Sequence, residues 1–409
     1  MTTKPALLKP FCGVLPPADK AHLVATRSYV TYSDYELKDK LARNPFSYLH
    51  VIHPSGEQTP HGADMQPIRE AFEAFVDRGW LERDEQAAYY ALRQESPLGT
   101  VTGLVGLVPV QAVRDKRVKV HESTLSDREV LFANYLAQVG LNAEPALLGH
   151  APSPEIATLT ASVTAGRPDM DFTTADGVRH TLWRVVDGAA GSIESLLAAL
   201  DAVYIADGHH RVASSLRMAD AHPEHVAAQH FMALLVPGDQ LVFRGYHRIV
   251  NLHSHSLQPE RVKLAFDAME GVHWIEGEET EAPGIHLRGA LSGTLVVDAD
   301  SSGVTLPEWL QDRVLGPVFG ILKPRTDKRL QCVTDDQLAS WTAKEGDLAF
   351  VLPPLDFEGL KSVADAGRHM PPKSTWIAPK LRRGLALFDF GPAELSLIHI
   401  SEPTRPPDI

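Results

Sequence analysis

The chain has 409 residues, which is too long for one ordinary hydrophobic core, so two or three packed units are expected. Hydrophobic residues make up 44% and charged residues 22%, values near globular averages that argue against extensive disorder. The formal net charge of −13 would repel a phosphate backbone, and no long basic stretch offsets it, which argues against nucleic acid as a partner.

The cysteines and the apolar stretches bear on where the protein works. Cys12 and Cys332 lack metal-type spacing, which argues against a disulfide framework and against a thiolate zinc site. Residues 1–10 lack the charged-then-apolar order of a signal peptide. The most apolar stretch, residues 98–113, is short and interrupted by glycines and a proline. We therefore expect a cytoplasmic protein with no membrane contact.

Four elements are predicted in the first part of the chain. Pro67 suits the first turn of a helix whose apolar face holds Ile68, Phe72, Phe75 and Val76. Residues 89–113 predict two strands joined by a turn at Gly99. Residues 127–139 then predict a helix, and residues 159–163 a short strand.

Strands and helices alternate in the middle of the chain. Residues 181–186 predict a strand, and Ser192 is expected to cap the helix that follows. A short buried strand is expected at 202–206, and helical spacing continues over 212–219. A further strand is expected at 231–236. This order is typical of the α/β (α+β) class.

A second unit is predicted beyond residue 258. Its expected elements are a helix at 262–269, strands at 295–297 and 350–352, and a helix at 358–366. We expect an N-terminal and core α/β domain at 1–258 and a C-terminal α/β subdomain at 259–391. Residues 392–409 follow no periodicity and resemble a translated sequencing-adapter read-through, so a non-native tail is expected there.

The first candidate site is the string Asp207-Gly208-His209-His210-Arg211, between a predicted strand and a predicted helix. The first turn of a helix offers unpaired N–H groups to an anion, and Gly208 would permit close approach or a positive φ. Arg211 supplies a planar cationic fork, His210 can exchange a proton near neutral pH, and Asp207 can orient a histidine. The alternative is a helix capped by Asp207 with exposed histidines, which does not account for the arginine.

The second candidate site is the string Lys119-Val120-His121-Glu122-Ser123-Thr124, which precedes another predicted helix. His121 and Glu122 pair an imidazole with a carboxylate, the components of a general base or of a metal site. The alternative is a strand end followed by a capping Ser123 or Thr124, with Glu122 in solvent.

Two further segments carry clustered charge or proline. Residues 323–329 hold four cations and one acid, and Arg325 among them could bind a polyanion, although a solvated surface turn is the alternative. In residues 369–376, two prolines would present Lys373 on an extended backbone; the alternative is a stiff connection with Trp376 in the core. The remaining histidines, His180 and His247 included, show no convergent metal spacing and are expected to be structural or exposed.

Four blocks taken together resemble the domain-of-unknown-function 1015 family over about residues 10–391. The blocks are Asn44 to Pro54, Lys119 to Thr124, Ala206 to Arg211, and Met370 to Trp376 with Pro379 to Arg382. The family carries no settled activity, so membership by itself implies no reaction.

The Asp-Gly-His-His-Arg string is also similar to the phosphate-binding motif of the ParB/sulfiredoxin fold, and free-serine kinases share it. The resemblance implies a ParB/sulfiredoxin-like core with additional α/β elements and a C-terminal subdomain. It also implies that Gly208, His210 and Arg211 hold nucleotide phosphates at a helix N-terminus. His209 stands where sulfiredoxins carry a cysteine, so sulfinic-acid reduction is not implied. Partition-type DNA binding does not fit the acidic charge.

These patterns predict an enzyme, a nucleotide-dependent phosphotransferase acting on a small polar metabolite, with ATP or another nucleotide and Mg²⁺. The expected phosphate ligands are Gly208, His210, Arg211, Arg325 and Lys373. The expected catalytic residues are Asp207, Glu122, His121 and His209, with Asp207 or Glu122 accepting the hydroxyl proton.

Two other functions stay open at this point. One is a hydrolase in which Asp207, Glu122, His209 and His210 hold a divalent metal that activates water. The other is a non-catalytic regulatory module that binds nucleotide. The sequence names neither the substrate nor the nucleotide, and it leaves assembly into a homo-oligomer open.

Overall fold

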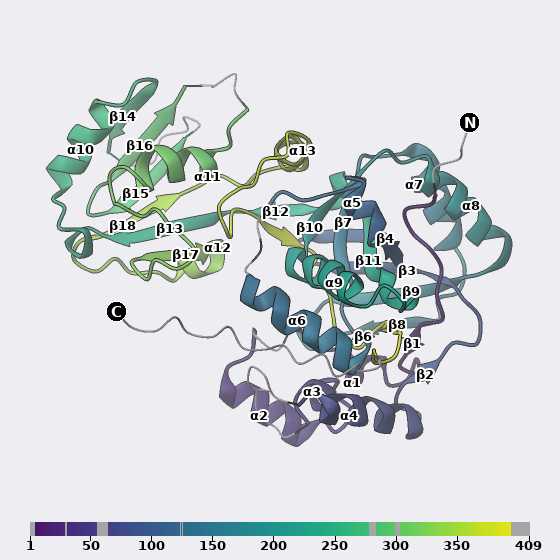
Figure 1. Cartoon of the computed structure of the whole chain (residues 1–409). Coiled ribbons are helices and arrows are strands. Elements are labelled where there is room, and N and C mark those ends of the chain that lie inside the picture. Colours follow the sequence, from purple (N-terminus) through teal and green to yellow (C-terminus); the bar gives the residue numbers. More distant parts are fainter. Residues whose placement is uncertain are drawn as a thin grey trace, which may run out of the picture.

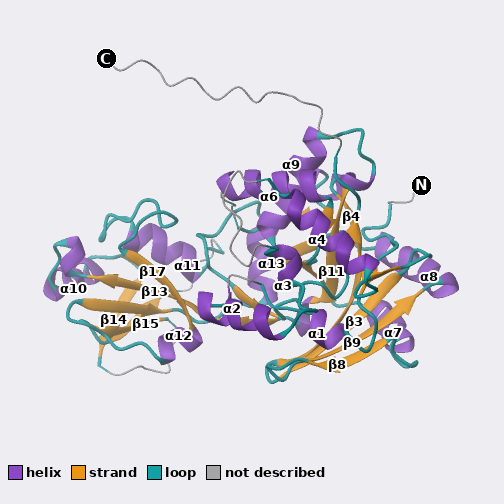
Figure 2. Cartoon of the chain, turned by 90° about the horizontal axis from the view of Figure 1, so that it is seen from below, coloured by secondary structure: helices purple, strands orange, loops and turns teal. Residues whose placement is uncertain are grey.

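A computed structural model of the chain describes residues 5–28, 31–54, 64–122, 124, 126–277, 284–298 and 303–393. Two β-sheets with their helices form two lobes, and the strand β12 (Val242–Arg244) and the helix α13 (Phe357–Asp365) lie between them (Figure 1). Figure 2 shows the same two lobes from below. The expected α/β fold class is confirmed.

The larger sheet has eight strands in the order β5-β10-β7-β11-β4-β3-β9-β8. In that order the strands are Val118–Lys119, Val203–Asp207, Ala146–His150, His230–Pro237, Gly99–Pro109, Tyr89–Ser96, Arg179–Val185 and Met170–Thr173. Most neighbours are antiparallel, whereas β10 runs parallel to β5 and β11 runs parallel to β7. The β10–β7 register breaks between Ile205 and Asp207, at the end of β10 where the candidate site begins.

Both faces of this sheet are covered, because successive side chains of its buried strands point to opposite sides. Ile205 and Leu235 pack with the helices of one face, whereas their neighbours Ala206 and Leu234 pack with α13 on the other. The helices of the first face are α7 (Pro154–Val163), α8 (Asp187–Ala198) and α9 (His209–Ala221). The segment that holds the candidate site is therefore anchored from both sides.

The N-terminal part forms a further layer against α6 (Ser126–Val139). Phe72 and Phe75 of α4 pack with Val139 and Leu141 in one buried cluster. The elements of this part are β1 (Val14–Leu15), α1 (Ala21–Val24), α2 (Asp34–Arg43), α3 (Leu49–Ile52), α4 (Gln66–Asp77), β2 (Glu82–Arg83) and β6 (Leu141–Asn142). The short helix α5 (Gln111–Arg114) packs instead on the larger sheet.

The smaller sheet has six strands in the order β14-β16-β15-β18-β13-β17, and all its pairs are antiparallel. In that order the strands are Val272–Glu276, Gly293–Val297, Ile285–Gly289, Asp347–Val351, Tyr246–Asn251 and Leu330–Thr334. Its helices are α10 (Pro259–Asp267), α11 (Leu306–Trp309), the π-helix η5 (Leu310–Leu315) and α12 (Asp335–Ala339). Phe266, Leu310 and Phe350 belong to its buried cluster.

The chain enters the second lobe and returns to the first. The strand β13 already belongs to the smaller sheet, whereas Phe357 and Leu360 of α13 pack against the larger one. The last strands, β19 (Trp376–Ala378) and β20 (Phe388–Asp389), pair with β12 and β6. The domain limits 1–258 and 259–391 stay predictions. Within the expected 392–409 tail, the Ala393 N–H donates to the Ala137 carbonyl at 2.9 Å, and residues 394–409 lie outside the described part.

One predicted element and the predicted ends of two others were wrong. Residues 159–163 are the end of helix α7, because Ser153 accepts the N–H of Ile156 and Pro154 occupies the first turn. Ser192 lies inside α8 rather than at its start, and its hydroxyl donates to the Gly188 carbonyl. The second strand of the 89–113 pair ends at Pro109, after which the short helix α5 begins.

The remaining predicted elements are confirmed within a few residues. They are the helices predicted to begin near residues 67, 127, 212, 262 and 358, and the strands predicted to begin near residues 89, 99, 181, 202, 231, 295 and 350. Across the described residues, no helix is both long enough and apolar enough to span a bilayer.

Candidate functional site

The turn between β10 and α9 centres on Gly208. Its φ of 98° lies in the left-handed region, and a Cβ built on it would approach Arg211 Nε to 2.7 Å. Gly208 is the N-cap of α9, and no side chain in the described part of the chain caps this helix, so its first-turn N–H groups are available to an anion. Asp207 does not act as the cap, because both its carboxylate oxygens bond to cations.

A chain of ion pairs surrounds this turn. Asp207 Oδ1 accepts from Lys380 Nζ at 2.9 Å, and Oδ2 accepts from an Arg211 terminal nitrogen at 2.7 Å. The other terminal nitrogen of Arg211 donates to Glu144, whose second oxygen accepts from Arg383 Nε at 2.7 Å. Burial would raise the pKa of Asp207 and of Glu144, but the cations beside them hold both pKa values below the ordinary range.

The two candidate motifs meet through a pair of imidazoles. The rings of His121 and His209 lie 4.4 Å apart at 89°, and His121 is fully buried. Burial lowers the pKa of His209 to about 4, and burial together with the neighbouring His209 and His369 holds the pKa of His121 well below its usual range. Both rings are therefore neutral at pH 7. Among the described residues, His121 Nδ1 and His209 Nε2 are buried without a hydrogen-bond partner.

Glu122 has the chemistry of a general base. It forms an isolated parallel bridge with Met370. Burial raises its pKa to about 7, although the backbone N–H of Lys373 and the Arg325 guanidinium favour the charged form. The carboxyl group thus exchanges a proton near neutral pH, which is the property that general base catalysis requires.

A buried arginine fixes the loop that contacts Glu122. Arg248 is 3% exposed and donates to the carbonyls of Pro372 at 3.2 Å and Lys373 at 3.1 Å. Lys373 has a φ of 56°, an unusual value for a residue with a side chain, and its ammonium group is exposed. Arg248 therefore holds this loop in the conformation whose N–H group bonds to Glu122.

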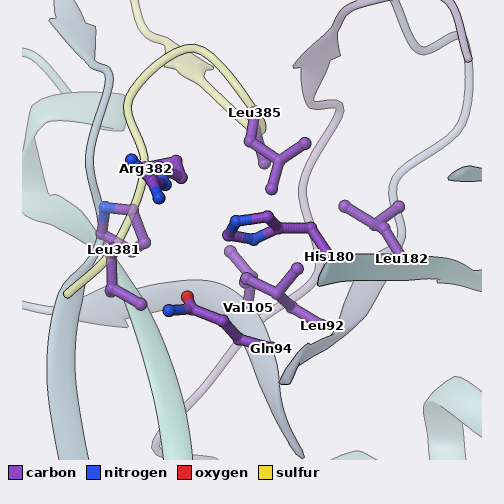
Figure 3. A pocket seen from close by; sticks show the side chains of 10 residues that line it. Leu92, Gln94, Val105, His180, Leu182, Leu381, Arg382 and Leu385 are labelled. Carbon is purple, nitrogen blue, oxygen red and sulfur yellow. The ribbon is translucent and has the colours of Figure 1, made fainter. Parts of the chain in front are cut away.

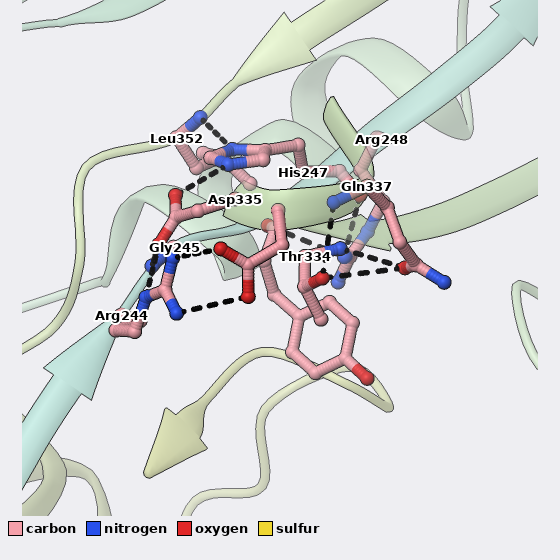
Figure 4. Close-up of polar contacts among 10 residues, drawn as sticks. Arg244, Gly245, His247, Arg248, Thr334, Asp335, Gln337 and Leu352 are labelled. Atoms are coloured by element: carbon pink, nitrogen blue, oxygen red, sulfur yellow. Dashed lines mark hydrogen bonds and ion pairs between the residues drawn. The ribbon is translucent and has the colours of Figure 1, made fainter. Parts of the chain in front are cut away.

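The polar contacts around β13 in Figure 4 are structural. His247 Nδ1 accepts the Leu352 N–H at 3.2 Å, so Nε2 carries the proton and donates to Asp335 at 2.9 Å. Burial lowers the pKa of His247, which keeps the ring neutral in this role. Asp335 also accepts from Arg244 Nε and from the Gly245 N–H.

The other predicted residues lie around the same region. One Arg325 terminal nitrogen donates to the Thr124 carbonyl at 2.6 Å. Burial, with smaller contributions from the charges of Arg128 and Arg325, lowers the pKa of His210, and His210 Nδ1 is buried without a hydrogen-bond partner among the described residues. Ser123 lies outside the described residues.

An open pocket of about 360 Å³ adjoins the site. It is lined by Gln311 and Asp312 of η5, by Arg325 and by residues 369–372, among others. Met370 connects this pocket to the second candidate site, residues 119–124, because its N–H donates to the His121 carbonyl at 2.8 Å.

A second, closed pocket lies against the larger sheet (Figure 3). It is lined by His180, Gln94 and Arg382 among apolar side chains, and its volume of about 10 Å³ is that of one water molecule. Both His180 ring nitrogens are buried with no hydrogen-bond partner in the part of the chain that the structure describes, and burial lowers the pKa of His180 to about 4. His180 is therefore a neutral histidine in the core. Of the two roles expected from the sequence, structural or exposed, it has the structural one.

The sequence did not indicate Glu144 or Arg383, because neither carries a local signal. His369 and Lys380 lie in the segments 369–376 and 379–382 but had no predicted role. Across the described residues, no group of three or more His, Cys, Asp and Glu side chains is placed to hold a metal ion.

Comparison with known proteins gives one family match. The model of a family described as "Protein of unknown function (DUF1015)" matches residues 8–345. The C-terminal block at 370–382 lies beyond this range, so its part of the resemblance stays a prediction. No curated protein matches the chain.

Several solved structures are similar at low identity. SbnI from Staphylococcus aureus, with a C-terminal truncation, is 12% identical, with a TM-score of 0.41 over 67% of this chain and 82% of that one. A free serine kinase in complex with AMP is 15% identical, with a TM-score of 0.38 over 70% of this chain and 90% of that one. A mutant of free serine kinase in complex with ADP is 13% identical, with a TM-score of 0.38 over 70% and 91%.

Proposed function

We propose, for a chain that belongs to the DUF1015 family of proteins of unknown function, a nucleotide-dependent phosphotransferase that acts on a small polar metabolite. One observation supports the proposal: the ring centroids of His121, the neighbour of Glu122, and His209, the neighbour of Gly208, lie 4.4 Å apart. The Glu122 carboxyl group, whose pKa is raised to about 7, also feels the charge of Asp207, which precedes the N-terminus of α9.

The Gly208 turn is the expected phosphate site. The free N–H groups of the first turn of α9 suit phosphate oxygens, and the missing side chain at Gly208 lets them approach. Lys380 and Lys373 are exposed cations from the C-terminal segment that can add charge to the site. Arg211 is bonded to two carboxylates, so its expected contribution is to orient Asp207 at the turn.

Glu122 is a better proton acceptor than Asp207. Asp207 is held ionised by Lys380 and Arg211 and is therefore a weak base, whereas Glu122 takes up a proton near pH 7. In the proposed step the substrate hydroxyl oxygen bonds to the terminal phosphorus, and the bond from that phosphorus to the bridging oxygen breaks. The hydroxyl proton passes to Glu122, and the nucleoside diphosphate leaves with the bridging oxygen.

Mg²⁺ would neutralise phosphate charge in such a reaction. Mg²⁺ commonly binds one or two carboxylates together with substrate phosphates, and Asp207 would serve as such a ligand once Lys380 or Arg211 released one of its oxygens. His121 Nδ1 and His209 Nε2, which have no hydrogen-bond partner among the described residues, would contribute hydrogen bonds inside the site.

The test separates binding from transfer. Calorimetry of the full chain with ATP, ADP and pyrophosphate should show binding, and phosphorus NMR with a mixture of small hydroxylated metabolites should show ADP together with a phosphorylated product. Glu122→Gln should retain nucleotide and lose transfer. Binding without transfer in the presence of any metabolite would favour the regulatory module, and no binding at all would contradict the proposal.

A further inference from the structure

Three polar side chains meet at the closed pocket against the larger sheet (Figure 3). Gln94 of β3 and His180 of β9 lie directly opposite each other across the two strands, so their side chains share one face of the sheet. Arg382 reaches the same pocket from the C-terminal segment. All three residues are more than nine-tenths buried. They form a polar spot in a lining that is otherwise apolar.

Each of these side chains keeps a buried polar atom that has no hydrogen-bond partner among the described residues. Gln94 Nε2 donates to the Lys380 carbonyl at 3.5 Å, which leaves Oε1 as an unused acceptor. Arg382 donates to Asp176 through a terminal nitrogen at 2.5 Å, which leaves the Nε–H as an unused donor. Both ring nitrogens of His180 are unused, and because the ring is neutral, one of them donates and the other accepts.

The size of the pocket and the pattern of donors and acceptors together select the ligand. A volume of about 10 Å³ suits one water molecule and no organic group. Water can donate to Gln94 Oε1, accept from the Arg382 Nε–H and bond to one ring nitrogen of His180, which gives it the usual number of bonds for a buried water. An ion fits less well, because a cation would face the guanidinium group and an anion would face the amide oxygen.

We propose that this pocket binds one ordered water molecule, which ties the C-terminal segment to β3 and β9. The segment that carries Arg382 also carries two cations of the candidate site. Lys380 donates to Asp207 at 2.9 Å, and Arg383 donates to Glu144 at 2.7 Å. The water thus anchors the stretch of backbone between these two cations. This inference goes beyond the proposed function, because the water site requires no nucleotide.

The experiment measures nuclear Overhauser effects (NOEs) from water to the full chain, with isotope-labelled histidine and arginine. In the wild type, the Arg382 Nε–H should show the NOE of a long-lived water. Gln94→Leu removes the acceptor, and His180→Phe removes both ring nitrogens but keeps a ring stacked on Phe172. Both variants should lose the NOE. Gln331→Leu, at an exposed residue of β17, is the matched control and should retain it.

Hydrogen exchange of the same proteins measures the anchoring of the segment. The Arg383 N–H donates to the Thr26 carbonyl at 2.9 Å, so its exchange reports whether the segment stays in place. The amides of residues 381–387 should exchange at least about tenfold faster in the two pocket variants than in the wild type and the control, because a lost hydrogen bond favours local opening by about that factor.

The outcomes separate this inference from the proposed function. A wild type without the NOE at Arg382, or an NOE that persists in both pocket variants, would overturn the inference. Unchanged hydrogen exchange after loss of the NOE would also overturn it, because the water would then not anchor the segment. None of these measurements depends on ADP. A failed ADP titration would therefore contradict the phosphotransferase and leave the water site standing.

Discussion

Lys380 Nζ lies 2.9 Å from Asp207 Oδ1, although 173 residues separate the two along the chain. The contact joins the C-terminal segment to the turn between β10 and α9. Burial alone would raise the pKa of Asp207, but Lys380 and Arg211 outweigh it and hold that pKa below its usual range. Asp207 is thereby fixed as a permanent anion, which leaves proton transfer to Glu122.

Lys380 should matter more for ligand binding than for the fold. Lys380→Met keeps the aliphatic stem and removes the charge, so we expect ADP binding about tenfold weaker, in the range of a lost charged hydrogen bond. The unfolding free energy should fall by only about 1 kcal/mol, because the lysine is largely exposed. Calorimetry and urea denaturation measure the two effects. Lys344→Met, at another exposed lysine, is the control, and equal ADP binding by the two variants would refute the role.

Glu144 should be a main determinant of stability. Its side chain is 11% exposed between Arg211 and Arg383, so Glu144→Gln leaves two partly buried cations without their counter-ion. We expect a loss of about 3 kcal/mol in the free energy of unfolding. Urea denaturation measures it against Glu270→Gln, an exposed glutamate that should change little. A loss below about 0.5 kcal/mol would mean that the two arginines find other partners.

Gly208 and Gly177 form a matched pair. Both have positive φ, 98° and 79°, so alanine at either position should cost about 1–2 kcal/mol of stability from backbone strain. At Gly177 no atom lies within 4 Å of the added Cβ, whereas at Gly208 the Cβ meets Arg211. Thermal denaturation should therefore show Gly208→Ala to be the less stable of the two. The reverse order would show that Arg211 moves aside at little cost.

The stability of the protein should depend on the ionisation of Glu122. Its pKa is raised from 4.5 to about 7, so the folded state favours the protonated form. This contribution is fully present below the unfolded pKa and is lost as the pH rises through about 7. Glu122→Gln avoids the ionisation. The variant should melt above the wild type at about pH 8, and the difference should vanish at about pH 4.5. Parallel melting curves over this range would contradict the raised pKa.

Local patterns predicted most of the fold. The buried run of β10, the glycine turn and the helical spacing of α9 all depend on neighbouring residues, and the structure has them where expected. Residues 159–163 were misread because their Leu-Thr-Ala-Ser-Val alternation imitates a strand, whereas the capping Ser153 six residues upstream starts a helix.

The candidate site was predictable only in part. Gly208, His209 and Glu122 lie in recognisable strings, and the structure brings these strings together. Glu144 and Lys380 join the site through contacts across 67 and 173 residues, which no local pattern encodes. The pairing of Arg211 with two carboxylates was equally invisible, because it depends on where the loop of Glu144 packs.

The most direct test of phosphate binding at the Gly208 turn is calorimetric titration of the full chain with ADP and Mg²⁺, run for the wild type, Gly208→Ala and Gly177→Ala. The account predicts one site in the wild type, the same affinity in Gly177→Ala, and at least about tenfold weaker binding in Gly208→Ala. Wild-type protein that binds no ADP, or equal affinity in all three proteins, would contradict it.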